Sequence, residues 1–104
     1  MRNKYHARPT YVNGIRFASK KEADRYVQLL YLSDTYKIQS LTLQVNFPLI
    51  KKSKYGREIK YVADFVYYKD GKMIVEDVKG YKTPVYRLKK RLMAELYDVV
   101  IKET

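Results

Sequence analysis

A chain of 104 residues, 46% of them hydrophobic, predicts a single folded domain with a small core. The absence of cysteine excludes disulfides and thiolate metal sites, and no apolar run is long enough to span a membrane, so we expect a soluble, intracellular protein. Twenty-two basic residues against eleven acidic ones give a net charge of +11, which favours nucleic acid as a partner over an anionic membrane or a basic surface that serves only solubility.

The first 18 residues are expected to form a basic arm and a small hairpin. His6 is the single histidine, and we interpret it as a solvated residue and not as a catalytic base. Asn13-Gly14 lies between two short runs of β-formers and predicts a hairpin over residues 10–17, short and peripheral. The arm residues expected to contact phosphates are Arg2, Lys4 and Arg8.

A helix is predicted to begin at Ser19 and to end in the polar stretch 33–37. Ser19 and Glu22 have the spacing of a capping box, in which each side chain bonds to a backbone amide at the helix start. Glu22 also lies beside the apolar face of the helix, so it is either a cap, an acid directed toward a metal site, or both. The apolar face itself is predicted from Ala23, Tyr26, Val27 and Leu30.

Alternating apolar and polar residues from Leu41 to Leu49 predict a half-buried strand. Pro48 indicates an edge position or a strand end, and Gln44 lies on the polar face. The basic loop that follows, residues 51–57, is either a solvated turn or a phosphate contact, and the high net charge favours the contact. Its candidate DNA-binding residues are Lys52, Lys54 and Arg57.

The longest pattern is a β-hairpin, with alternating β-formers before and after Asp70-Gly71. This dipeptide is typical of a two-residue type I′ turn, whose central residues both need positive φ. A two-residue turn pairs Lys69 with Lys72, and paired residue numbers then keep the same sum along the ladder. Asp64 is therefore expected opposite Asp77.

The expected register places two carboxylates and one ammonium group on a single face. Asp64 and Asp77 share this face because they are opposed, and Lys79 shares it because side chains alternate along a strand. Opposed carboxylates repel, so the pattern favours a divalent cation between them, with the lysine suited to a phosphate or an attacking water. The alternative is a surface salt bridge between Lys79 and its acidic neighbours. The apolar neighbours expected on this face are Val62, Val66 and Val75.

Thr83-Pro84 predicts the start of a second helix, and residues 97–102 are interpreted as a last strand. The expected apolar stripe of this helix consists of Val85, Leu88, Leu92 and Leu96. Basic residues on and before the helix are candidates for DNA binding, namely Lys82, Arg87, Lys89 and Lys90. The predicted order is helix, three antiparallel strands, helix and strand, an α/β core over residues 19–104 with helices on both faces of a mixed sheet.

Asp64 on one strand and Asp77-Val78-Lys79 on the next resemble the motif of the PD-(D/E)XK nuclease superfamily. The predicted element order is similar to that superfamily's restriction-endonuclease-like core, although Ala63 stands where the motif's name has proline. Nearly the whole chain further resembles small phage- and prophage-encoded proteins assigned to the same fold. The segments that carry this likeness are Asn3-Lys4-Tyr5, Gly14–Phe17, Ser19–Ala23, Gln44, Tyr61–Phe65 and Val75–Gly80.

The resemblance implies a Mg²⁺-dependent DNA endonuclease, with Mn²⁺ as a second suitable ion. Asp64, Asp77 and the carbonyl of Val78 would hold the metal, and Glu22 would help through a metal-bound water. Lys79 would orient or activate the attacking water.

By analogy with nucleases that carry a glutamine on this strand, Gln44 would position the scissile phosphate or Lys79. Glu76 is an extra acid beside Asp77, and because side chains alternate along a strand it points to the opposite face. We therefore assign the metal to Asp77 and expect Glu76 to be a structural or helix-facing partner.

Resolvases of branched DNA are among the small members of this superfamily, which implies selectivity for DNA structure such as Holliday junctions. Resolution needs two cuts, so a homodimer is expected, and the phage resemblance implies the cytoplasm of a bacterial host. The main alternative is a non-catalytic DNA-binding protein that assists replication or recombination and retains the nuclease fold. RNA as the substrate is a weaker alternative.

Overall fold

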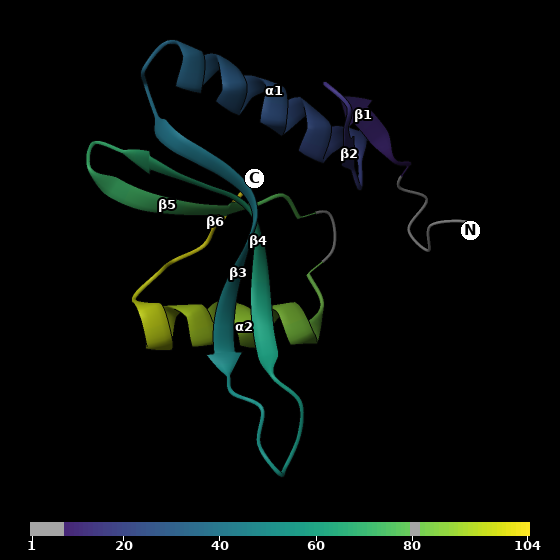
Figure 1. Cartoon of the computed structure of the whole chain (residues 1–104), viewed down its shortest axis with the longest axis vertical. Coiled ribbons are helices and arrows are strands. Elements are labelled where there is room, and N and C mark those ends of the chain that lie inside the picture. Colours follow the sequence, from purple (N-terminus) through teal and green to yellow (C-terminus); the bar gives the residue numbers. More distant parts are fainter. Residues whose placement is uncertain (1–7, 80–81) are drawn as a thin grey trace.

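The computed structural model of the chain describes residues 8–79 and 82–104, so the predicted arm contacts Arg2 and Lys4 lie outside the described residues. Two helices cover a four-stranded sheet, and a small separate hairpin lies beside the first helix (Figure 1). The sheet order is β3-β4-β5-β6, antiparallel except for the parallel pair β5-β6, which confirms an α/β fold with a mixed sheet. The elements in chain order are β1 (Thr10–Val12), β2 (Ile15–Phe17), α1 (Lys20–Asp34), β3 (Gln39–Ile50), β4 (Ile59–Lys69), β5 (Lys72–Asp77), α2 (Pro84–Tyr97) and β6 (Lys102–Glu103).

The central hairpin β4-β5 has the predicted turn and register. Asp70 and Gly71 have φ values of 51° and 77°, as a type I′ turn requires. Pairing runs without a shift from Lys69↔Lys72 to Phe65↔Glu76. The pairing ends one step before Asp64 and Asp77, so the predicted opposition of the two carboxylates is the extension of this register and stays a prediction.

Strands β3 and β4 turn from one helix to the other halfway along their length (Figure 1). Leu43 and its partner Phe65 pack with α1, whereas Val45 and its partner Ala63 pack with α2. Residues two apart would share a face in a flat strand. Gln44 lies between these pairs with a φ of 52°, a left-handed conformation that costs an ordinary residue about 1–2 kcal/mol. Because of this kink, the same pair of strands packs against both helices.

Helix α1 buries a face that differs slightly from the predicted one. Ala23 and Tyr26 are buried as expected, and Leu30 is partly buried. The prediction for Val27 was wrong, because its side chain is 49% exposed, and Leu29 is fully buried instead. The inward stripe is centred on the row through Tyr26 and Leu29, which places Val27 at its margin.

The predicted apolar stripe of α2 is confirmed only for Leu92, which is partly buried against the core, and is wrong for its other three members. Val85, Leu88 and Leu96 are 62%, 58% and 54% exposed, and the helix buries Tyr86 and Met93 instead. Two neighbouring faces of this helix carry apolar residues, and periodicity alone does not decide which one meets the sheet. Within the described residues, neither helix is long and apolar enough to cross a membrane.

The predicted last strand over residues 97–102 was also wrong. Helix α2 continues into this range and ends at Asp98, whose φ of 55° is a left-handed cap. Strand β6 consists only of Lys102–Glu103, which pairs with Glu76 and Asp77 of β5. The β-branched residues 99–101 before it belong to no strand, although their composition is typical of one.

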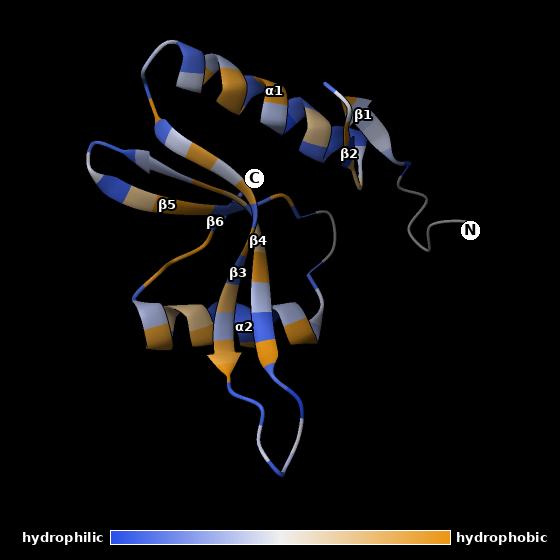
Figure 2. Ribbon diagram, viewed as in Figure 1, coloured by the Kyte–Doolittle hydropathy of each residue, from blue (hydrophilic) through white to orange (hydrophobic). Residues whose placement is uncertain are grey.

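Strand β3 lies at the edge of the sheet, as Pro48 indicated. The loop between β3 and β4 projects beyond the sheet and is mostly hydrophilic, with residues of intermediate hydropathy near its tip (Figure 2). A bridge between Ser53 and Gly56 closes its tip. The predicted basic residues of the loop are all exposed there, namely Lys52, Lys54 and Arg57.

Candidate active site

The N-termini of the two helices lie on the same side of the molecule (Figure 1). Contacts among the predicted site residues connect Glu22, Gln44 and Asp64, and Lys79 with Asp77. Glu22 belongs to the first turn of α1, and Lys79 lies shortly before the start of α2. Asp64 lies on β4 at the kink of the sheet. Both helices therefore direct the positive ends of their dipoles to this side of the molecule.

Asp64 is held by the backbone of the neighbouring strand. Its Oδ2 accepts a hydrogen bond from the Val78 amide at 2.9 Å. On the other side of this segment, Asp77 O accepts from Thr104 N at 3.0 Å. Backbone groups alternate along an extended chain, so the carbonyl of Val78 points with its amide toward Asp64. The Val78 carbonyl, which was predicted to be a metal ligand, therefore lies on the edge of the strand that faces Asp64.

The two aspartates strongly influence each other. Asp77 is almost completely buried, with 1% of its surface exposed. Burial is the main cause that raises the pKa of Asp64 to about 8, and the adjacent Asp77 carboxyl raises this pKa further. Two carboxylates this close cannot both be charged at low cost unless a cation lies beside them.

Lys79 forms an ion pair with the buried aspartate. Its Nζ lies 2.9 Å from Asp77 Oδ2. This contact lacks the angle of a hydrogen bond, and among the described residues Asp77 Oδ2 has no hydrogen-bond partner. Lys79 is only 25% exposed, so the surface salt bridge considered from the sequence does not describe this pair. Asp77 Oδ2 could therefore still coordinate a cation.

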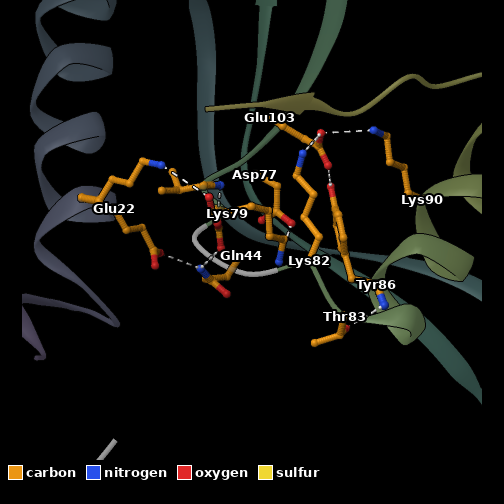
Figure 3. Close-up of polar contacts among 12 residues, drawn as sticks. Glu22, Gln44, Asp77, Lys79, Lys82, Thr83, Tyr86, Lys90 and Glu103 are labelled. Carbon is orange, nitrogen blue, oxygen red and sulfur yellow. Dashed lines mark hydrogen bonds and ion pairs between the residues drawn. The ribbon is translucent and has the colours of Figure 1, made fainter. Parts of the chain in front are cut away.

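Glu22 is both near the helix cap and directed toward the aspartates. Its backbone amide donates to Ser19 Oγ at 3.2 Å, which is the serine half of the predicted capping box. Its carboxylate accepts from Gln44 Nε2 at 3.4 Å, and the same nitrogen lies 3.5 Å from Asp64 Oδ1 (Figure 3). Burial raises the pKa of Glu22, and the charge of Asp77 adds to this effect. Gln44 thus links the two acids.

The donor set fits a small divalent cation at the two aspartates. Among the described residues, no group of three or more His, Asp or Glu side chains is close enough to hold a metal ion by itself. Asp64, Asp77 and the Val78 carbonyl offer only oxygen, and Mg²⁺ prefers few carboxylates plus water and substrate oxygens. Glu22 is separated from them by Gln44, so direct ligation by Glu22 does not fit, whereas a contact through water does.

Two cavities are lined by predicted site residues, one by Asp64 and the other by Lys79. The first, about 250 Å³, is lined by Glu22, Gln44 and Asp64 together with residues 15–18 of the hairpin region. The hairpin was predicted to be peripheral, and this was wrong, because β2 forms a wall of the cavity. The second cavity, about 270 Å³, borders Lys79 and residues of the first turn of α2.

The predicted DNA-binding residues near α2 divide into two groups. Lys82 and Lys90 both pair with Glu103 Oε1, at 3.1 and 3.2 Å (Figure 3). Arg87 is exposed on the helix, and Lys89 borders the second cavity. The remaining described candidates are exposed, namely Arg8, Lys52, Lys54 and Arg57.

The sequence reading missed two residues that contact the site lysine and its surroundings. Tyr86 places its ring 4.3 Å from Lys79 Nζ, and its hydroxyl donates to Glu103 Oε2 at 2.7 Å. This hydrogen bond is the main cause that lowers the pKa of Glu103 to about 2. Tyr86 lies beside the stripe that was predicted to be buried, and the sequence gives no local signal for Glu103, because its partners Lys82 and Lys90 are distant in the chain.

Glu76 is the helix-facing partner that was predicted. It is fully buried, and both its oxygens accept from the Arg25 guanidinium of α1. Tyr67 OH also donates to it at 2.6 Å. Burial alone would raise the pKa of Glu76, but these bonds outweigh it and hold this pKa below its usual value. Glu76 therefore fastens α1 to the sheet and leaves Asp77 as the acid of the site.

Comparison of the chain with curated proteins gave no match, and comparison with solved structures gave none either. Residues 2–103 match the family described as a protein of unknown function (DUF1064), and because this match covers nearly the whole sequence, the chain belongs to that family.

Proposed function

We propose that this protein is a Mg²⁺-dependent DNA endonuclease with a restriction-endonuclease-like core. The family description names no activity, so the proposal depends on the site. The observation that carries it is the closeness of Asp64 and the buried Asp77 at the end of the β4-β5 ladder, with Lys79 at 2.9 Å from Asp77. This spacing of two acids and a lysine is what the resemblance to PD-(D/E)XK nucleases led us to expect.

Each residue of the site has a role in phosphodiester hydrolysis. A bound Mg²⁺ would lower the pKa of a coordinated water and neutralise charge on the phosphate. Asp64, Asp77 and the Val78 carbonyl would hold this ion. Lys79 would orient the attacking water and stabilise negative charge that develops on the phosphate oxygens. Gln44 would position the phosphate, because its amide already lies between Glu22 and Asp64.

DNA is the proposed substrate because of the charge and its placement. The chain carries +11, and basic residues lie on the loop after β3 and at the start of α2. Such contacts bind the phosphate backbone and do not read bases. A domain of this size has little surface for sequence recognition, which favours recognition of branched DNA.

We further propose a homodimer that forms through the exposed stripe of α2. Val85, Leu88 and Leu96 lie along one row of the helix and are more than half exposed. The adjacent row runs through Arg87, Arg91 and Glu95, and Arg91 pairs with Glu95 at 3.9 Å on the exposed surface. An antiparallel pair of helices would bring the Glu95 end of one copy toward the basic start of the helix in the other. An exposed apolar row of this length therefore favours a second copy as the occupant.

One assay distinguishes a nuclease from an accessory protein. The wild-type protein is incubated with labelled Holliday junction, duplex or single-stranded DNA, in the presence of Mg²⁺ or of EDTA. Metal-dependent cleavage of the junction alone would support a structure-selective nuclease. Cleavage of all three substrates would support a general nuclease. Tight binding in both conditions with no cleavage would instead support the accessory protein that retains the fold.

A further inference from the structure

Glu103 is the centre of a polar cluster between β6 and α2. Its Oε2 accepts from Tyr86 OH at 2.7 Å, and its Oε1 pairs with Lys82 and Lys90 at 3.1 and 3.2 Å (Figure 3). The parallel pairing Asp77↔Glu103 places this cluster directly beside the site strand. The short strand β6 therefore brings an acid to the start of α2.

Tyr86 connects this cluster to the site. The residue is 7% exposed, and its backbone amide donates to the cap Thr83 Oγ1 at 3.0 Å. The cap therefore holds the backbone of Tyr86, and Glu103 holds the hydroxyl at the end of its ring. Lys79 Nζ lies 4.3 Å from the centre of this ring, well within the range of a cation–π contact.

We propose that Tyr86 is a positioning residue that holds the ammonium group of Lys79 in the site, and that Glu103 fixes Tyr86 for this purpose. The inference depends on the proposed function. Lys79 now pairs with Asp77, but this attraction weakens once Asp77 is committed to a cation. A cation–π contact retains the ammonium group without using its N–H donors, so all three stay available for water and phosphate oxygens. The hydrogen bond to Glu103 also makes the ring more electron-rich, which strengthens the contact.

The contact can be tested without metal or DNA. A ring 4.3 Å from Lys79 Nζ is expected to shift the NMR signals of the Lys79 ε-protons upfield. The shift should persist in Tyr86→Phe, which keeps the ring, and should disappear in Tyr86→Leu. An unshifted Lys79 signal in the wild-type protein would overturn the proposal, whatever the variants do.

The functional consequence is tested by single-turnover cleavage with the same variants. Tyr86→Leu is expected to lower the cleavage rate about 10-fold, with DNA affinity in EDTA within about 2-fold of wild type. Tyr86→Phe and Glu103→Gln are expected to lose only about 2- to 3-fold, because the ring remains near Lys79. Tyr97→Leu is the matched control, since Tyr97 lies at the far end of the same helix, and it should cut at the wild-type rate.

The outcomes separate this inference from the proposed function. If wild type does not cut any DNA, the nuclease proposal fails, and the NMR shift still decides whether the contact exists. If wild type cuts and Tyr86→Leu cuts as fast as Tyr97→Leu, only the positioning role fails. Equal losses in Tyr86→Phe and Tyr86→Leu would assign the effect to the hydroxyl and overturn the role of the ring.

Discussion

Gln44 and Asp64 lie opposite each other at the point where β3 and β4 turn from α1 to α2, with Gln44 Nε2 3.5 Å from Asp64 Oδ1. The left-handed backbone of Gln44 makes the turn, and its side chain joins Asp64 to Glu22. One residue therefore shapes the sheet and takes part in the site. Strained conformations that the surrounding structure maintains are common at functional sites.

Gln44→Gly should separate these two contributions of Gln44. Glycine adopts the left-handed conformation without steric cost, but it loses more backbone entropy on folding. These terms nearly cancel, so we expect the free energy of unfolding to change by less than about 1 kcal/mol. Cleavage should fall by about 10-fold or more, because the amide that links Glu22 and Asp64 is gone. A variant that is equally stable and fully active would exclude a role for the Gln44 side chain.

The metal-free protein should lose stability as the pH rises from about 5 to 8. The folded-state pKa of Asp64 is raised to about 8 from 3.8, so over this range the folded state keeps a proton that the unfolded state releases. The raised pKa of Glu22 acts in the same direction. The lowered pKa values of Glu76 and Glu103 affect stability only at more acidic pH.

Thermal unfolding in EDTA across this pH range measures the effect. Asp64→Asn should have a flatter profile and a higher Tm than wild type at pH 8. Addition of Mg²⁺ to wild type should raise Tm more at pH 8 than at pH 6, because the site must release its proton to bind a cation. A Tm that rises with pH in EDTA would contradict the raised pKa of Asp64.

Arg25→Met should destabilise the fold without acting on the site directly. It leaves the Glu76 carboxylate buried with only Tyr67 as a described partner, and breaking a buried pair in this way costs about 3–5 kcal/mol. The double variant with Glu76→Gln should recover much of this loss. Lys20→Met is the control, because the Lys20–Asp24 pair is exposed and should contribute under about 1 kcal/mol. Denaturant unfolding measures all three.

Leu88→Lys should abolish the proposed dimer. The side chain is 58% exposed in the single chain, so the substitution should leave the monomer folded. Each copy carries +11, so dimerisation of wild type should strengthen with added salt, the reverse of DNA binding. Sedimentation at two salt concentrations measures both effects. A wild-type protein that stays monomeric at high concentration in high salt would exclude this interface, and vesicle binding by the stripe would point to a membrane instead.

Local chemistry made the central hairpin predictable. Asp70-Gly71 set the turn, and the turn set the register whose extension opposes Asp64 and Asp77. The inward role of Glu76 followed from the same alternation. All of these features depend on residues close in sequence.

Features that depend on packing between distant segments were not predictable in this way. Helix α2 buries the face with Tyr86 and not the face with Val85 because of contacts with Glu103 and the sheet. The periodicity of the helix sequence contains no information on these contacts. The wall that β2 adds to the cavity depends on where the hairpin packs. The left-handed conformation of Gln44 has no local signal, because glutamine rarely adopts it.

The most direct test of the central claim is single-turnover cleavage of a labelled Holliday junction in Mg²⁺ by wild type, Asp77→Asn and Asp24→Asn. Asp24 is an exposed acid of α1 and provides the same substitution outside the site. We expect Asp77→Asn to lose cleavage by at least about 1,000-fold while it binds the junction as tightly as wild type or more tightly. Asp24→Asn should match wild type. An Asp77→Asn variant that folds and cuts DNA at the wild-type rate would contradict the proposed active site.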